Sequence, residues 1–168
     1  MKTLKLFAIA LAGLLLAACA KPAADNTQPP PIASTDVVKA TPEELTLAKG
    51  QSSYANVRVQ IQNGYHVNAN PPSFSYLIGT ELQLTPAAGI SVDFITYPDA
   101  VTRNFAFAPD GPLKVYEGET IIKPMIKAAP SAETGKHNLS AKLRVQACDD
   151  QVCYAPGTID LTIPVTVK

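Results

Sequence analysis

The stretch NLSAKLRVQA, residues 138–147, alternates strictly between polar and apolar side chains, and this alternation decides the fold class. Two further stretches, YANVRVQIQNGYHV at 54–67 and TIDLTIPVTV at 158–167, follow the same scheme over most of their length. Because successive side chains of a strand point to opposite faces, the pattern predicts half-buried β-strands. In the first stretch the predicted inward face consists of Leu139, Ala141, Leu143, Val145 and Ala147.

Weaker strands are expected at 45–47, 81–85, 90–95 and 120–127, and the segments between the strands are rich in proline and glycine. About seven short strands predict an all-β fold, an antiparallel immunoglobulin-like β-sandwich that forms a single domain. The absence of tryptophan argues against a true immunoglobulin domain. Pro164 lies on the polar face of the last stretch, which suits an edge strand because proline cannot donate to a sheet ladder.

The first residues predict export. Lys2 and Lys5 precede the apolar run LFAIALAGLLLA, which is too short for a relaxed membrane span and has the length of a signal-peptide core. The run ends in LAAC, residues 16–19, which resembles a bacterial lipobox. We therefore expect residues 1–18 to be a cleaved signal peptide and Cys19 to carry the lipid. The alternatives are an ordinary secretory signal with an incidental cysteine, and an uncleaved anchor.

Residues 19–41 are rich in alanine, proline, serine and threonine and have few large apolar side chains, so they predict a flexible tether. The sandwich domain is then expected to span 42–168. Loss of Lys2 and Lys5 with the leader leaves two fewer basic residues than the 14 acidic ones, which gives no electrostatic case for nucleic acid. No other apolar stretch is long enough to cross a bilayer, so the lipid is the expected membrane anchor.

The stretch QACDDQVCYAP, residues 146–156, contains the remaining two cysteines. Setting Cys19 aside leaves Cys148 and Cys153, an even pair in an exported and oxidising setting. Extending the alternation of 138–147 by one residue points Cys148 outward, so its sulfur is expected to be accessible. The pair could serve as a structural staple, as part of a metal site, or as a disulfide that opens and closes.

The energetics of so short a loop weigh against a staple as the sole role. A disulfide between neighbours this close removes only roughly 2 kcal/mol of unfolded-state entropy. A metal site needs three or four ligands, and the only histidines, His66 and His137, do not stand at ligand spacing from the cysteines. We therefore expect neither a metal nor an organic cofactor.

The charges inside the loop indicate which redox role is plausible. Asp149 and Asp150 follow Cys148 directly and disfavour a thiolate there, and no lysine or histidine lies within the loop. The pair is thus expected to be a disulfide that a partner's thiolate attacks rather than an attacking thiol. The two aspartates could assist proton transfer, or they could be solvated turn formers.

These residues resemble a known family. QACDDQVCYAP is similar to the redox segment of the N-terminal periplasmic domain of the thiol:disulfide interchange protein DsbD and its stand-alone relatives, in which two spaced cysteines precede an aromatic residue and a proline. NGYHVNANPPS at 63–73 and VYEGETII at 115–122 also fit. The similarity runs over about residues 42–168, and it implies an immunoglobulin-like sandwich with Cys148 and Cys153 as the exchanging pair.

The resemblance also implies a relay. In the family, the domain receives electrons through a thioredoxin-like domain and passes them to periplasmic proteins such as disulfide isomerases by transient mixed disulfides. An aromatic cap loop covers the family's disulfide. The matching stretch here is 115–118, so Tyr116 is the candidate cap residue, and Tyr154 is expected to flank the sulfur of Cys153. Packing of both tyrosines on the sheet is the alternative.

The sequence therefore predicts a lipid-anchored protein on the periplasmic side of a bacterial envelope that exchanges its disulfide with thioredoxin-like or disulfide-isomerase-type partners. Ala20 after Cys19, in place of aspartate, favours the outer membrane. The alternative is a non-catalytic binding or assembly module whose disulfide only braces a hairpin, so whether the protein is an enzyme stays open. The fused domains of the best-known family member lie outside the residues matched here, so any electron donor is expected to act in trans.

Overall fold

The computed structural model describes residues 32–168, and within them the chain forms one short 3-10 helix and thirteen β-strands. The predicted signal peptide, Cys19 and the first part of the tether lie outside the described residues. Among the described residues no helix is long and apolar enough to span a bilayer. The elements are η1 (Ser34–Val37), β1 (Val38–Pro42), β2 (Leu45–Leu47), β3 (Ser52–Tyr54), β4 (Val57–Ile61), β5 (His66–Asn68), β6 (Glu81–Leu84), β7 (Ile90–Thr96), β8 (Val101–Arg103), β9 (Leu113–Tyr116), β10 (Glu119–Ala128), β11 (Gly135–Val145), β12 (Ala147–Cys148) and β13 (Gly157–Val167).

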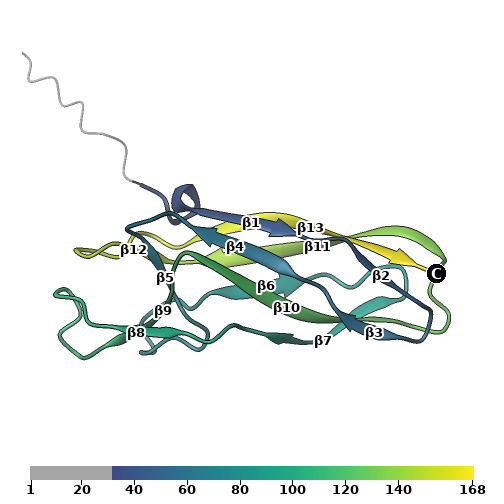
Figure 1. Cartoon of the computed structure of the whole chain (residues 1–168), viewed down its shortest axis with the longest axis horizontal. Helices are drawn as coiled ribbons and strands as arrows, with labels where there is room; N and C mark the ends of the chain where they lie inside the picture. Colours follow the sequence, from purple (N-terminus) through teal and green to yellow (C-terminus); the bar gives the residue numbers. More distant parts are fainter. Residues whose placement is uncertain (1–31) are drawn as a thin grey trace, which may run out of the picture. The chain divides into compact units, whose positions relative to one another are not determined.

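Two sheets form the sandwich, and a third extends from one end of it (Figure 1). The first sheet has the order β1-β4-β10-β3, with β7 also paired to β10, and the second has the order β2-β13-β11-β6. The third, β12-β5-β9-β8, is built from the short strands that lead into the loops at the end opposite the C-terminus. All pairings are antiparallel except that of β13 with β2, so the predicted all-β, antiparallel, immunoglobulin-like sandwich is confirmed.

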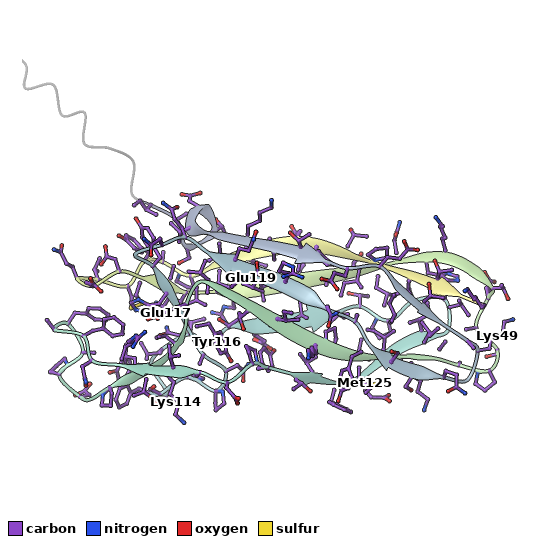
Figure 2. All side chains as sticks on the ribbon, in the orientation of Figure 1. Lys49, Lys114, Tyr116, Glu117, Glu119 and Met125 are labelled. Atoms are coloured by element: carbon purple, nitrogen blue, oxygen red, sulfur yellow. A yellow bond between two sulfur atoms is a disulfide. The ribbon has the colours of Figure 1, made fainter. Side chains whose placement is uncertain are left out.

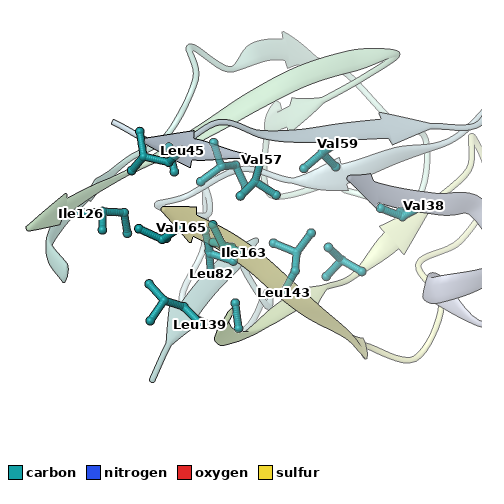
Figure 3. Packing of buried hydrophobic residues seen from close by; sticks show 14 of the residues in the cluster. Val38, Leu45, Val57, Val59, Leu82, Ile126, Leu139, Leu143, Ile163 and Val165 are labelled. Carbon is teal, nitrogen blue, oxygen red and sulfur yellow. The ribbon is translucent and has the colours of Figure 1, made fainter. Parts of the chain in front are cut away.

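The alternation of the sequence builds the core directly. In β11 the side chains of Leu139, Leu143 and Val145 are fully buried, whereas the polar residues between them are exposed. Figure 3 shows Val57 and Val59 of the first sheet packed against buried residues of the second, in one continuous cluster. Burial of each such side chain contributes about 1.5–3 kcal/mol, which makes this cluster the main source of stability.

In the last strand, β13, the predicted inward face is confirmed, but the predicted edge position is wrong. The buried side chains of β13 are on the expected side, although Ile159 and Leu161 are only partly covered. The strand lies between β2 and β11 rather than at an edge. Pro164 is tolerated because β2 pairs only with Val165–Val167, so the missing N–H of the proline falls just beyond that ladder.

The folded domain also begins earlier than residue 42. Residues 34–37 form η1 and residues 38–42 form β1, which pairs with β4 from Val38 opposite Ile61 onward. The side chains of Val37 and Val38 are buried in the core. Two apolar residues in a segment otherwise rich in alanine and proline were too weak a signal to separate this strand from a tether.

Candidate functional site

The disulfide between Cys148 and Cys153 closes a tight hairpin at the loop end of the domain, with the two Cα atoms 3.9 Å apart. The backbone N–H of Asp149 donates to the carbonyl of Val152 at 3.0 Å, and that of Tyr154 donates to Ala147 at 2.8 Å. One carboxylate oxygen of Asp149 accepts from the N–H groups of Gln151 and Val152, both at 2.8 Å, which is the usual way an aspartate fixes a turn. The hairpin therefore holds both sulfurs at its base.

The two cysteines differ in access. Cys148 is 0% exposed, whereas Cys153 is half-buried. The prediction that Cys148 points outward is wrong because β11 ends at Val145 and the chain then pairs with a different strand. In the new ladder Ala147 lies opposite Val67 and Cys148 opposite His66, so the alternation counted along β11 no longer applies.

Gln146 lies where the chain leaves the sheet of β11 and begins to pair with β5. Its side chain helps to fix this new pairing. Its side-chain oxygen accepts hydrogen bonds from the backbone of Ile78 and the side chain of Asn68, both at 3.0 Å. Its side-chain nitrogen donates to the carbonyl of Tyr154 at 3.3 Å. One side chain thus connects β5, the loop before β6 and the far arm of the hairpin.

Ser34 fastens the hairpin from the other side. Its hydroxyl accepts from the N–H of Ala147 at 2.9 Å and donates to the carbonyl of Ala155 at 2.6 Å. The serine is itself fully buried, and its bond to Ala147 is shielded from water. Ser34 lies in the segment predicted to be a tether, and it therefore helps to hold the hairpin of the cysteine pair.

Two residues that flank the cysteines, Asp149 and Tyr154, form a charge-assisted hydrogen bond. The hydroxyl of Tyr154 donates to the second carboxylate oxygen of Asp149 at 2.6 Å. This bond raises the pKa of Tyr154 to about 12, and it is the main cause that lowers the pKa of Asp149 below its ordinary value. Asp149 is thereby committed to shaping the hairpin, while Asp150 stays exposed at the turn.

An aromatic loop covers the ladder residue opposite Cys148. The ring of Phe105, in the loop between β8 and β9, stacks on that of His66 with ring centres 4.1 Å apart, and Phe107 stacks on Phe105 at 5.2 Å. Figure 1 shows this loop and the β12–β13 loop extending at the same end of the domain. The hydroxyl of Tyr76 braces the loop by donating to Asp110 at 2.9 Å.

Tyr116 does not belong to that loop. It lies in β9, is only 2% exposed, and its hydroxyl accepts the N–H of Asn70 at 3.0 Å. Figure 2 labels Tyr116 and Glu117 toward the loop end of the domain and Lys49 near the other end. Sequence reasoning missed Phe105. Its signal was the run NFAF, two aromatic residues that lie outside any alternating strand in a segment rich in proline, glycine and aspartate.

A cavity of about 380 Å³ opens beside the covered histidine. Its walls include Tyr65, His66, Phe105 and the ion pair of Arg103 with Glu117, whose two bonds measure 2.9 and 2.8 Å. Among residues 32–168 no group of three or more histidine, cysteine, aspartate or glutamate side chains comes together in a way that could hold a metal ion.

These features define a class of protein, an immunoglobulin-like β-sandwich with a hairpin disulfide next to a histidine that an aromatic loop covers. The chain belongs to the family described as thiol:disulfide interchange protein DsbD, N-terminal, which it matches over residues 34–163. The resemblance drawn from QACDDQVCYAP is thereby confirmed. No curated protein sequence matches the chain.

Two solved structures are similar to this one. The N-terminal periplasmic domain of ScsB from Proteus mirabilis has 19% sequence identity and a TM-score of 0.49, with 75% of this chain and 44% of that chain covered. The seventh ScaB type I cohesin from Pseudobacteroides cellulosolvens has 8% identity and a TM-score of 0.48, with 78% and 92% covered. The chain thus spans less than half the length of the ScsB chain.

Proposed function

We propose that this protein relays electrons on the periplasmic side of the envelope by thiol–disulfide exchange at Cys148 and Cys153, held to the membrane by a lipid on Cys19. The observation that carries the proposal is the hairpin disulfide with one sulfur buried and the other half-buried, in a chain of the DsbD N-terminal family. The partners are thioredoxin-like or disulfide-isomerase-type proteins. The sorting residue Ala20 favours the outer membrane.

The difference in access supports an order in which the two sulfurs react. A partner thiolate attacks Cys153, the accessible sulfur, and forms a mixed disulfide while the bond to Cys148 breaks. The electron pair of that bond stays on the sulfur of Cys148, which takes up a proton. The partner's second thiol then displaces Cys153 and leaves the partner oxidised, so the domain carries two electrons. The reverse sequence delivers them to the disulfide of a second protein.

The loop that contains Phe105 controls entry to this chemistry. With the loop closed, Phe105 covers His66, the residue opposite Cys148, so the loop shields the Cys148 side of the bond. Opening of the loop uncovers His66 and the buried Cys148 side of the bond, next to the half-buried Cys153 that the partner attacks. Phe105 therefore takes the cap role that the family resemblance gave to Tyr116, and Tyr116 supports the core beneath it.

Thiol trapping with single-cysteine variants tests the proposal. In cells, Cys148→Ser leaves Cys153 as an accessible free thiol and is expected to accumulate mixed disulfides with thioredoxin-like proteins. Cys153→Ser leaves only the buried Cys148 and is expected to trap far fewer. A double variant without either cysteine is the control.

The opposite result would support a binding or assembly module whose disulfide only braces the hairpin. In that case the pair stays oxidised in every reductase background, and neither single variant forms a mixed disulfide. Burial of Cys148 fits that role too, which is why the trapping of Cys153 decides between the two functions.

A further inference from the structure

His66 lies directly opposite Cys148 in the ladder between β5 and β12. Residues opposite each other in an antiparallel pair present their side chains on the same face, with Cβ atoms about 4.5–5.5 Å apart. His66 is only 3% exposed, and its Nε2 makes no hydrogen bond within the part of the chain that the structure describes. A buried ring nitrogen without a partner costs free energy, and here the ring belongs to the residue opposite Cys148, whose sulfur leaves during reduction.

The surroundings of His66 change when the cap opens. With Phe105 stacked on it, burial lowers the pKa of the imidazole, while Glu117, Asp150 and Asp149 act in the opposite direction. Arg103, which binds Glu117, is the cation on this side of the cavity. Once the loop lifts away, water reaches the ring and the effect of burial is lost, but the carboxylates remain. The ring is then able to take up a proton.

We propose that His66 is the acid–base residue of the exchange, supplying a proton to Cys148 during reduction and taking it back during oxidation. The inference rests on the proposed function. As the partner's sulfur bonds to Cys153, the bond between the cysteines breaks and its electron pair stays on the sulfur of Cys148. The proton of the imidazolium moves to that sulfur, which leaves a thiol and a neutral ring. Water then reprotonates the ring.

The other titratable groups of the hairpin are less suited to this role. Asp149 is bound to the turn and to Tyr154, which holds its pKa below the ordinary value, so it stays ionised at neutral pH. Tyr154, with a pKa of about 12, is a weak acid toward a thiolate. His66 alone combines a place opposite Cys148 with a ring nitrogen that is not already bound.

The test is the pH dependence of disulfide reduction by dithiothreitol in the full chain. The rate constant is expressed per dithiothreitol thiolate between about pH 5.5 and 8, across the ordinary range of histidine. In the wild-type chain this rate constant is expected to rise as the pH falls and the imidazolium forms. His66→Phe keeps a ring beneath Phe105 but cannot give a proton. The pH profile of this variant is expected to be flat. At about pH 6 its rate constant is expected to lie below that of the wild-type chain by up to about tenfold.

His137→Phe is the matched control, because His137 is partly exposed in β11 and bonds the carbonyl of Glu133. It should leave the profile unchanged. His66→Gln keeps a polar side chain that does not titrate, and it carries the test if His66→Phe does not fold by circular dichroism. A wild-type profile in His66→Gln, or in folded His66→Phe, overturns the acid–base role. Failure of Cys153 to trap any partner in cells overturns the proposed function whatever these profiles show.

Discussion

Strands β11 and β12 are separated by a single residue, Gln146, yet different kinds of contact hold them. From Leu139 to Val145 every second side chain of β11 enters the apolar core, and the strand pairs with β13 from Gly135 opposite Val167 to Val145 opposite Gly157. In β12 the N–H of Ala147 is held by the hydroxyl of Ser34, a side chain from a distant segment. The sandwich therefore follows from local patterning, whereas the hairpin and its disulfide depend on long-range hydrogen bonds.

The strongest test of this comparison removes apolar packing from β11. Leu143 is fully buried in the core cluster, so Leu143→Ala should lower the free energy of unfolding by about 2–5 kcal/mol through lost burial and a cavity. Urea denaturation of the oxidised protein measures this. The neighbouring Lys142→Ala breaks only an exposed ion pair with Asp160, so it should change the urea concentration at the midpoint of unfolding little. Equal effects from the two variants would contradict the assigned faces.

Urea denaturation of a Ser34 variant tests the hydrogen bonds that hold the hairpin. Ser34→Ala leaves the buried N–H of Ala147 without its partner and removes the bond to Ala155. The expected loss is about 1–3 kcal/mol, with faster reduction of the disulfide because the hairpin is less firmly held. Thr35→Ala, one residue along the same 3-10 helix, is the control. Unchanged stability in Ser34→Ala would mean that the N-terminal segment does not support the hairpin.

The limits of prediction from the sequence follow the same division. The inward faces of β11 and β13 could be predicted because period-two alternation is a local signal that tertiary contacts only reinforce. The burial of Cys148 could not, because it depends on Gln146 reaching Ile78 and Asn68, which are far away in the chain. Phe105 was missed for the same reason, since only the folded loop brings it onto His66.

Removal of the cap ring should have a smaller effect on stability than on reactivity. Phe105 is half-buried in a loop, and an aromatic stack of this kind contributes about 0.5–1.5 kcal/mol. Phe105→Ala should therefore speed the reduction of the disulfide by dithiothreitol by up to about tenfold. The free energy of unfolding of the whole domain should change little. Phe94→Ala removes an exposed ring that contacts Tyr54 instead, and it should leave the rate as it was. A Phe105→Ala chain that is reduced at the wild-type rate would show that this loop does not shield the bond.

The smallest expected effect concerns the hydrogen bond of Tyr154 to Asp149, and it is best seen by titration. The bond raises the pKa of Tyr154 to about 12 from its ordinary value of 10.0, so its stabilising contribution is complete below pH 10.0 and is lost as the pH rises through about 12. At the acid end the pKa of Asp149 is lowered, so the contribution is present above the ordinary value of 3.8 and is lost as the pH falls through the lower folded value. The difference in tyrosinate absorbance between wild type and Tyr154→Phe isolates this one hydroxyl. A midpoint near 12 is expected, whereas a midpoint near 10 would mean that the tyrosine is free of Asp149 and that the turn is held by the backbone bonds of the aspartate alone.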